Sequence, residues 1–339
     1  MSREDSGFLA AEAGLRYVGP DAAGYRRVRR GRGFSYITAD GQTVNGNVRK
    51  RIEALVVPPA WDDVWISRDP LGHIQATGQD KAGRKQYIYH PRWEDIRDEA
   101  KFERLTPLGQ GLAELRKRVD SDLRRRGLPR DKVVALAVAV LDRTLLRVGS
   151  TRYAEDNDSY GLTTLTNEHI EVDGLHVHLE FAGKGGAELQ LAFRDRRLAR
   201  LVACCQELAG QTLFSYETSE GETSSITSSD VNSYLSDALN GPFTAKDVRT
   251  WGASALVTGE LARTMDEPDP DSRFLAAIDV AAERLGNTRA VCRDSYVHPA
   301  ISQVNSEGRL TEIWRRAKSG KWTNRDESAL RILLEEEVG

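Results

Sequence analysis

The chain has 339 residues, 40% of them hydrophobic and 29% charged, which is the composition of a folded protein large enough for two domains. No apolar run approaches the roughly 18 residues that a membrane span needs, and the first residues lack the basic and then apolar order of a secretion signal. Three cysteines offer neither a disulfide framework nor paired metal ligands, so we expect a protein of the reducing cytoplasm.

The net charge of -3 hides an uneven distribution of charge along the chain. Residues 1–130 hold 25 Lys and Arg against 18 Asp and Glu, whereas residues 131–339 hold 23 against 33. Within the basic part, residues 26–32 concentrate five arginines, enough to bind phosphates electrostatically if they face one way. A solvated, partly mobile arm is an equally good interpretation of this run.

Short runs of β-forming residues alternate with turn residues from about residue 15 to residue 93. The runs lie at residues 34–38, 63–67, 74–77 and 86–89. They predict a small, mainly β N-terminal domain over residues 1–93, with a linker that opens at Pro91-Arg92-Trp93. Apolar residues then recur at helical spacing, so we expect a larger, mainly α domain over residues 94–339.

The first half of the predicted helical domain combines a buried helix with a small antiparallel sheet. Asp131 can cap a helix whose stretch 133–140 is apolar throughout, and we expect this helix to reach Arg147 and to stop at Gly149. Strands are predicted near residues 168–172, 175–181 and 188–193. An Asp-Gly turn joins the first two, and a glycine-rich turn that holds Lys184 joins the last two.

Helices are predicted again over the rest of the chain. They lie near residues 198–208, 230–239, 244–263, 272–285 and 295–304, with a final charged helix from about residue 323. Thr244 with Asp247 three residues later has the pattern of a capping box. The fold class that follows is α+β, a mainly β N-terminal domain before a mainly α domain that carries a small antiparallel hairpin sheet.

Candidate residues for phosphodiester chemistry lie at the ends of these predicted elements. Cleavage without a metal needs a nucleophile, cationic donors for the nonbridging oxygens and an acid for the departing alkoxide. A tyrosine such as Tyr296 can attack, but with a pKa of about 10 only roughly one phenol in a thousand is ionised at pH 7, a deficit near 4 kcal/mol. As fixed cations, Arg147 and Arg249 could stabilise the phenolate and so offset this free-energy deficit. Lys184 could act as the acid.

Each candidate also has an ordinary structural explanation. Arginines at helix ends are usually surface residues, and Lys184 among glycines suits an exposed turn. Asn287 after a glycine suits a helix C-terminus in the left-handed region, and Tyr296 suits half-buried packing. The histidines at residues 169, 176 and 178 lie on predicted strands and lack further ligands at metal-binding spacing, so we expect solvent-facing histidines and no metal site.

Six motifs follow one another along the chain. They are Leu146-Arg147-Val148-Gly149, Ser159-Tyr160-Gly161-Leu162-Thr163-Thr164-Leu165, Phe181-Ala182-Gly183-Lys184, Lys246-Asp247-Val248-Arg249-Thr250-Trp251-Gly252-Ala253, Leu285-Gly286-Asn287-Thr288 and Ser295-Tyr296-Val297-His298-Pro299. Taken together, they resemble the ordered motifs of type IB DNA topoisomerases, in particular the small bacterial branch similar to the poxvirus enzymes. The segment Gly83-Arg84-Lys85-Gln86-Tyr87-Ile88-Tyr89-His90-Pro91 resembles the first-domain signature of that branch. The resemblance covers roughly residues 30–305.

The resemblance implies that Tyr296 attacks the DNA phosphate and stays joined to the 3′ end while the 5′ hydroxyl departs. Arg147, Arg249 and Asn287 would stabilise the transition state, and Lys184 would protonate the leaving oxygen. Many members of the family have His where Asn287 stands; Asn can donate a hydrogen bond to a phosphoryl oxygen but cannot carry a proton.

Further residues are implied as DNA contacts. Lys246 and Tyr153 match phosphate-contacting positions of the catalytic domain. In the first domain the matching positions are Arg84, Gln86, Tyr87 and Tyr89. Alternation along a strand would put the two tyrosines of the first domain on one face.

The family resemblance further implies a two-domain clamp around duplex DNA, which relaxes supercoils by strand rotation before religation and needs neither ATP nor a metal. A monomer suffices for this chemistry, and duplex DNA is the implied partner, without a membrane and without an obligate protein partner. The implied location is the bacterial cytoplasm at the nucleoid. We expect the acidic charges of the second domain to face away from the DNA.

Two alternatives remain open at the level of sequence. A tyrosine recombinase uses the same attack and a similar order of residues, but commonly has His three residues before the second arginine, where Lys246 stands here. A non-catalytic nucleic-acid-binding protein could use the arginine-rich run and the tyrosine strand alone, and it would need neither Tyr296 nor Lys184.

Overall fold

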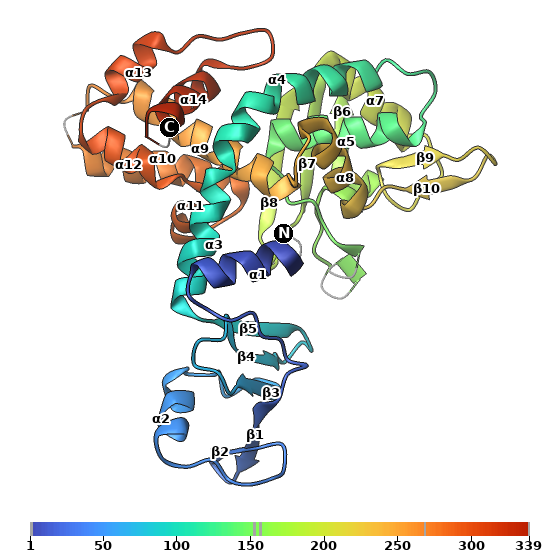
Figure 1. Ribbon diagram of the computed structural model, residues 1–339. Coiled ribbons are helices and arrows are strands. Elements are labelled where there is room, and N and C mark those ends of the chain that lie inside the picture. Colours follow the sequence, from blue (N-terminus) through green and yellow to red (C-terminus); the bar gives the residue numbers. More distant parts are fainter. Residues whose placement is uncertain (1–2, 152–153, 156–157, 268, 338–339) are drawn as a thin grey trace. The chain divides into compact units, whose positions relative to one another are not determined.

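A computed structural model describes residues 3–151, 154–155, 158–267 and 269–337 of the chain (Figure 1). The chain divides into two compact units, an N-terminal unit of residues 1–101 and a C-terminal unit of residues 102–339. The predicted α+β fold class is confirmed, because an antiparallel sheet comes first and a mostly helical part with small antiparallel sheets follows. No helix in the described part of the chain has the length and apolar character of a membrane span.

A five-stranded antiparallel sheet with the order β2-β1-β3-β4-β5 forms the N-terminal unit. The strands are β1 (Gly24–Arg30), β2 (Gly33–Ile37), β3 (Asp62–Ser67), β4 (Ile74–Gln79) and β5 (Lys85–Tyr89). The four predicted strands are confirmed. The helix α2 (Gly46–Ala54) buries Ile52 against Ile66 and Ala76 of the sheet, which gives this unit its own core.

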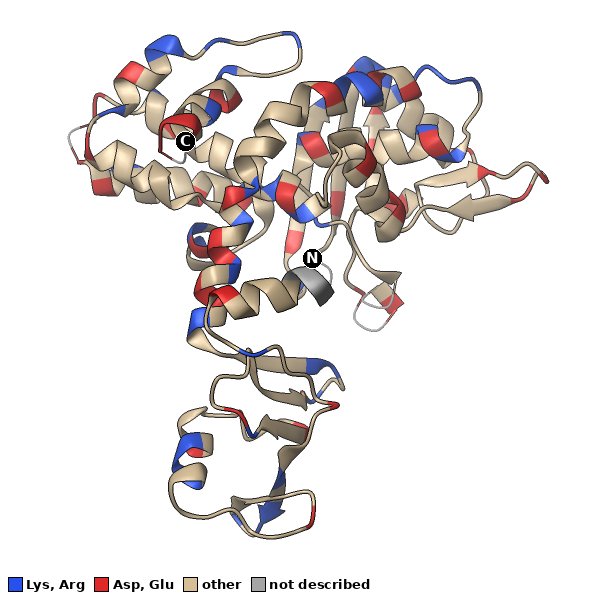
Figure 2. Ribbon diagram, in the orientation of Figure 1, with Lys and Arg blue, Asp and Glu red and all other residues tan. Residues whose placement is uncertain are grey.

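The arginine run at residues 26–32 is not a mobile arm, because most of it is β1, which pairs with β2 on one side and with β3 on the other. Figure 2 shows the basic residues along this strand. Alternation turns Arg27 towards the core side, where its guanidinium donates to the carbonyl oxygens of Val57 (3.1 Å) and Pro58 (3.0 Å) and lies 4.2 Å from the ring centroid of Phe34. Arg27 is therefore structural, whereas Arg26 stays exposed on the opposite face.

The segment at residues 91–93, where the sequence predicts the start of a linker, is helical, because Pro91 is the first residue of the helix α3 (Pro91–Glu103). Proline suits the first turn of a helix, where its missing N–H would have no partner in any case. Trp93 is buried in a small second core with Ala10 of helix α1 (Arg3–Glu12) and Leu15. Trp93 therefore contributes to the packing of the N-terminal unit.

The C-terminal unit is built from helices around the central helix α9. The helices are α4 (Leu105–Asp122), α5 (Arg130–Thr144), α7 (Arg196–Gln206), α8 (Ser228–Leu239), α9 (Ala245–Arg263), α10 (Pro270–Leu285), α11 (Arg289–Tyr296), α12 (Pro299–Ser306), α13 (Leu310–Arg316) and α14 (Arg325–Glu337). Helix α9 contacts α10, α14, α11 and α4, and most of its side chains are buried. The capping box of Thr244 and Asp247 at its start is confirmed.

Small sheets complete the C-terminal unit. The predicted sheet is present as β6 (Ile170–Asp173), β7 (His176–Ala182) and β8 (Glu188–Arg194), in that order and antiparallel. The 3-10 turns η1 (Leu162–Thr164) and η2 (Asn167–His169) precede it. A second hairpin of β9 (Ser215–Glu217) and β10 (Thr223–Ser225) was not predicted, because its strands are too short and polar to show a pattern.

Two predicted helix boundaries are wrong. Helix α5 ends at Thr144, because Leu145 adopts the left-handed conformation (φ 58°) and is buried in the core together with Leu146. The predicted helix at residues 295–304 is broken into α11 and α12. At the break the Ser254 hydroxyl donates to the carbonyl oxygen of Tyr296 (3.0 Å) and accepts from the N–H of His298 (3.1 Å).

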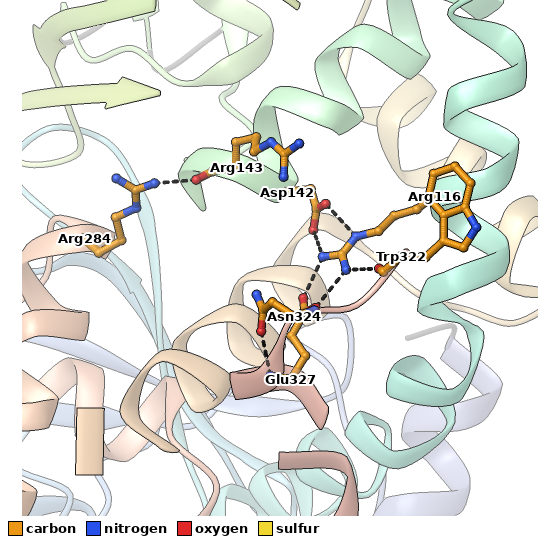
Figure 3. A network of polar contacts seen from close by, with 7 residues as sticks. All are labelled: Arg116, Asp142, Arg143, Arg284, Trp322, Asn324 and Glu327. Carbon is orange, nitrogen blue, oxygen red and sulfur yellow. Dashed lines mark hydrogen bonds and ion pairs between the residues drawn. The ribbon is translucent and has the colours of Figure 1, made fainter. Parts of the chain in front are cut away.

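A half-buried arginine fixes the C-terminal segment to the rest of this unit (Figure 3). Arg116 of α4 binds Asp142 of α5 through Nε and Nη2 (both 2.8 Å). It binds Glu327 of α14 through Nη1 (2.9 Å) and Nη2 (2.6 Å), and Nη1 also donates to the carbonyl oxygen of Trp322. All five N–H groups of the guanidinium thus have acceptors. Burial lowers the pKa of Arg116, but the two carboxylates hold it above its ordinary value.

Candidate active site

Four of the predicted catalytic residues converge in the C-terminal unit. Tyr296 is the last residue of α11, and Arg249 lies in the second turn of α9. Arg147 follows the end of α5 by three residues, and Asn287 lies between α10 and α11. Three regions that are far apart in the sequence, at residues 147, 249 and 287–296, therefore supply one cluster.

Arg249 is the buried centre of this cluster, with only 3% of its surface exposed. Its Nη1 donates to the carbonyl oxygen of Leu145, and its Nη2 to that of Leu285 at 3.4 Å. These carbonyls stand at the C-terminal ends of α5 and α10, where helices carry unpaired acceptors and partial negative charge. Burial lowers the pKa of Arg249 to about 10, partly opposed by the nearby Tyr296 phenol, so the guanidinium stays charged at neutral pH.

The ring of Tyr296 lies against this guanidinium, whose carbon is 5.3 Å from the ring centroid. Partial burial raises the pKa of the phenol, but the charges of Arg249 and Arg147, together with a hydrogen bond from Arg249, lower it by more. Lys246 acts in the same direction. The net pKa of Tyr296 is below its ordinary value, which favours the phenolate that a nucleophilic attack requires.

Arg147 is held by backbone pairing and not by a helix. Its carbonyl oxygen accepts from the N–H of Leu162, and that of Val148 accepts from the N–H of Thr163, both at 2.8 Å. Gly161 lies so close that a Cβ there would be 2.7 Å from the Arg147 carbonyl oxygen, so this position excludes side chains. The motifs at residues 146–149 and 159–165 are thus two segments whose backbones are hydrogen-bonded to each other.

Asn287 is bound to Arg147, whose Nη2 donates to its Oδ1. The guanidinium also reaches the carbonyl oxygen of Gly286, at 3.4 Å from Nη1 and 3.5 Å from Nη2. The left-handed residue at the end of α10 is Gly286 (φ 60°) and not Asn287, which corrects the predicted conformation. Among the described residues, the buried Nδ2 of Asn287 and Nε of Arg249 have no hydrogen-bond acceptor. Two donors in one cluster are therefore available to an anion.

Lys184 and Lys246 are exposed. Lys184 lies in the β7–β8 turn as predicted, at a position where its side chain is exposed. Lys246 lies in the first turn of α9, three residues before Arg249. Tyr153 lies outside the described residues.

The predicted DNA contacts of the N-terminal unit lie on or beside β5. Arg84 and Gln86 both donate to the Asp80 carboxylate, from Nε at 2.8 Å and Nε2 at 2.9 Å. The rings of Tyr87 and Tyr89 are stacked with centroids 5.7 Å apart, so the prediction that they share one face is confirmed. Tyr87 is 41% exposed.

The three histidines that the sequence places on strands lie in different surroundings. His176 and His178 are exposed on β7, as predicted. His169 is instead half-buried in η2, where its Nδ1 accepts from the N–H of Thr166 at 3.0 Å and its ring lies 4.2 Å from that of Tyr160. Nowhere in the described ranges do three His, Cys, Asp or Glu side chains lie where they could share a metal ion.

Sequence reasoning missed Ser254, which fixes the backbone at Tyr296, and the two helix-end carbonyls that bind Arg249. A serine inside a helix and a backbone oxygen give no pattern in a sequence. Only the packing of α11 against α9 shows their roles.

Comparisons with known proteins agree with these motifs. A family model described as the catalytic core of eukaryotic DNA topoisomerase I matches residues 90–316, and one described as the N-terminal domain of bacterial DNA topoisomerase IB matches residues 33–80. The chain is 30% identical over 285 residues to DNA topoisomerase 1B of Acanthamoeba polyphaga mimivirus, which covers 81% of this chain and 85% of the relative. It is 20% identical over 261 residues to DNA topoisomerase 1B of vaccinia virus strain Copenhagen, with 75% and 78% covered.

Proposed function

This chain belongs to the type IB DNA topoisomerase family, and we propose that it relaxes supercoiled duplex DNA by cutting and rejoining one strand through a covalent bond to Tyr296. The observation that carries the proposal is the Tyr296 phenol against the buried guanidinium of Arg249, with Arg147 and Asn287 beside it. This cluster combines a nucleophile of lowered pKa with donors that suit a phosphate.

In the cleavage step the phenolate oxygen of Tyr296 attacks a backbone phosphorus. A bond forms between that oxygen and phosphorus while the bond from phosphorus to the 5′ oxygen breaks. The DNA is left with a 3′-phosphotyrosyl end and, once the leaving oxygen has taken up a proton, a 5′ hydroxyl. The attack is unimolecular within the complex, so correct placement of the phosphate contributes directly to the rate.

The donors stabilise the pentacoordinate state of the phosphorus. Arg249 and Arg147 remain charged and can bind the nonbridging oxygens in pairs, as guanidinium groups do. The unpartnered Nδ2 of Asn287 adds a neutral donor. Because these groups are fixed before the DNA binds, little reorganisation is needed when negative charge develops.

Lys184 is proposed as the general acid, delivered on the turn of a hairpin. An ammonium group can give its proton to the 5′ oxygen and take it back when the strand is rejoined. The exposed position of the turn leaves this side chain accessible to a bound phosphate. Lys246, one turn before Arg249, is proposed as a phosphate contact, as is Tyr153.

Religation is the reverse reaction, in which the 5′ hydroxyl attacks the phosphotyrosine and releases Tyr296. The covalent link retains the energy of the broken bond, so the proposed cycle needs neither ATP nor a metal ion. Between the two steps the free strand rotates and the superhelical strain falls. A monomer is sufficient for this cycle.

The N-terminal unit is proposed as the second half of a clamp on the duplex. Tyr87 and Tyr89 share one face of the sheet, and cross-strand pairing puts Arg26, Trp65 and Thr77 in one row with Tyr87. A cation and aromatic rings on one face suit contacts to phosphates and to base edges. Arg84 and Gln86, both held by Asp80, are proposed as further DNA contacts.

Supercoiled plasmid incubated with the protein in chelator tests the proposal. We expect progressive relaxation by the unaltered chain, and with Tyr296→Phe we expect no relaxation and no covalent adduct while noncovalent binding stays near normal. A protein that only binds DNA would shift the plasmid without relaxing it, and a recombinase would require partner sites. Relaxation that persists in Tyr296→Phe would remove this residue as the nucleophile.

A further inference from the structure

Leu189, the second residue of β8, is half-buried and packs against two segments of the candidate site. Strand pairing sets it opposite the buried Phe181, so both side chains lie on the inner face of the sheet, at the end next to the Lys184 turn. A Cβ at Gly183 would be 2.7 Å from Cδ1 of Leu189, and a Cβ at Gly286 would be 2.4 Å from its Cδ2. One methyl group therefore lies against Gly183 and the other against Gly286.

Each of these glycines directly precedes a residue of the proposed chemistry. Gly183 comes before Lys184, the proposed general acid, and Gly286 comes before Asn287, a proposed donor to the phosphate. Because glycine has no Cβ, the side chain of Leu189 can approach both backbones closely. A single apolar side chain thus joins the segment that carries the acid to the segment that carries a phosphate donor.

We propose that Leu189 is a positioning residue that sets where Lys184 stands relative to the donors that bind the phosphate. The proposal rests on the proposed function, because it takes Lys184 as the acid and Tyr296 as the nucleophile. Leu189 has no group that donates or accepts a proton, so it acts only through Lys184.

The turn that carries Lys184 is closed by its own hydrogen bonds. The N–H of Gly183 donates to the carbonyl oxygen of Ala187 (2.8 Å), and the N–H of Gly186 donates to that of Gly183 (3.0 Å). Residues 185 and 186 have φ of 82° and 76°, a conformation that favours glycine. These bonds fix the shape of the turn, but its position relative to α10 depends on contacts outside the turn.

Contacts of the hairpin with two neighbouring segments supply that position. On one side the N–H of Tyr160 donates to the carbonyl oxygen of Ala182 at 2.8 Å, which binds the base of the hairpin to the backbone beside Arg147. On the other side Leu189 packs against Gly286 at the end of α10. Loss of this packing would leave the turn held from one of these two sides.

A small displacement of the acid has a large effect on proton transfer. The donor must come within about 2.6–3.2 Å of the oxygen that receives the proton. A misplacement of about 1 Å at a reacting group can cost about 10²-fold in rate. Leu189→Ala removes the methyl groups that contact both glycines, so it should displace Lys184 without changing the charge or the donors of the site.

Single-turnover cleavage of two substrates by Leu189→Ala tests the proposal. One substrate has the ordinary 5′ oxygen at the cleavage site, and the other has a 5′-bridging sulfur. We expect adduct formation with the oxygen substrate to slow by about 10- to 100-fold. The sulfur substrate should react at nearly the unaltered rate, because a thiolate leaves without a proton. Equal slowing of both substrates, or an unchanged rate with the oxygen substrate, would overturn the proposal.

Two further variants separate positioning from stability. Leu191→Ala is the matched control, because Leu191 lies on the same strand and face but is only 8% exposed and pairs with Leu179, farther from the turn. It should lower the melting temperature at least as much as Leu189→Ala and leave the ratio of the two cleavage rates unchanged. Leu189→Met keeps the apolar volume and should keep the rate with the oxygen substrate.

Failure of the proposed function would give a different result. In that case the unaltered chain would form no adduct with either substrate. If the chain does form adducts but the sulfur substrate fails to restore the rate of Lys184→Ala, Lys184 is not the acid, and the role of Leu189 is refuted together with that assignment.

Discussion

Replacement of Arg116 by methionine should destabilise the C-terminal unit more than any change of a surface ion pair. The guanidinium binds Asp142 and Glu327 bidentately and also binds a backbone carbonyl (Figure 3). Only 19% of its side chain is exposed, against 17% for Asp142 and 6% for Glu327. Methionine keeps most of the volume but leaves two largely buried carboxylates without a cation.

The magnitude follows from that burial. Removal of one partner from a buried ion pair costs about 3–5 kcal/mol, because the remaining charge loses its compensation. For a unit of this size, each kcal/mol lowers the melting temperature by roughly 2–4 °C, so we expect a fall of about 6–20 °C. Arg124→Met is the matched control, since Arg124 of the same region is 72% exposed in its pair with Asp120 and should cost about 0–1 kcal/mol.

Calorimetry of the full chain measures the shift, and hydrogen exchange of residues 325–337 shows whether α14 is released. A combined variant, Arg116→Met with Asp142→Leu and Glu327→Leu, should recover most of the loss, since buried ion networks can be replaced by apolar residues of similar volume. If Arg116→Met shifts the melting temperature no more than Arg124→Met, the reasoning from burial is refuted.

Three further predictions concern the site and its surroundings. Lys184→Ala should slow cleavage, and a substrate with a 5′-bridging sulfur should recover much of the rate, because a thiolate leaves without protonation; an equally slow reaction would contradict the acid role. Arg249→Lys should reduce single-turnover adduct formation by about 10²–10³, as expected when one fixed donor to a developing charge is lost, and an unchanged rate would exclude that role. Burial lowers the pKa of His298 to about 4, so its neutral form contributes stability above pH 6.5 that is lost as the pH falls to 4, about 3 kcal/mol in all. The urea midpoint of His298→Asn, which can still cap α12, should therefore fall less between pH 7 and pH 4 than that of the unaltered chain, and equal falls would count against this linkage.

The elements of the fold that depend on local pattern were predictable. The strands of the N-terminal unit, the β6-β7-β8 sheet and the capping box of α9 follow from alternation, turn residues and a Thr with a carboxylate three residues later. Helix ends that depend on tertiary contacts could not be predicted from the sequence. Leu145 takes a left-handed conformation that glycine usually occupies, because this buries its side chain, and the break after Tyr296 is set by a serine on another helix.

In the candidate site, too, some features could be predicted from the sequence and others depend on tertiary contacts. Its residue types and their order could be read from the motifs, and the structure brings Tyr296, Arg249, Arg147 and Asn287 together. The binding of Arg249 by two helix-end carbonyls depends on how three helices meet, and no spacing in the sequence expresses that. The arginine run of β1 was ambiguous for a related reason, since its pairing partners β2 and β3 decide which side chains remain exposed.

The hydroxyl of Ser254 has a mechanical consequence. Helix α9 carries both Arg249 and Ser254. The Ser254 hydroxyl donates a hydrogen bond to the carbonyl oxygen of Tyr296, the last residue of α11. A DNA strand joined to Tyr296 and under superhelical tension would exert a force on α11. Because α11 packs against α9, part of that force would be transmitted to α9. In the proposed cycle, Tyr296 and Arg249 would therefore move together and stay aligned for religation, because Ser254 ties the end of α11 to the helix that carries Arg249.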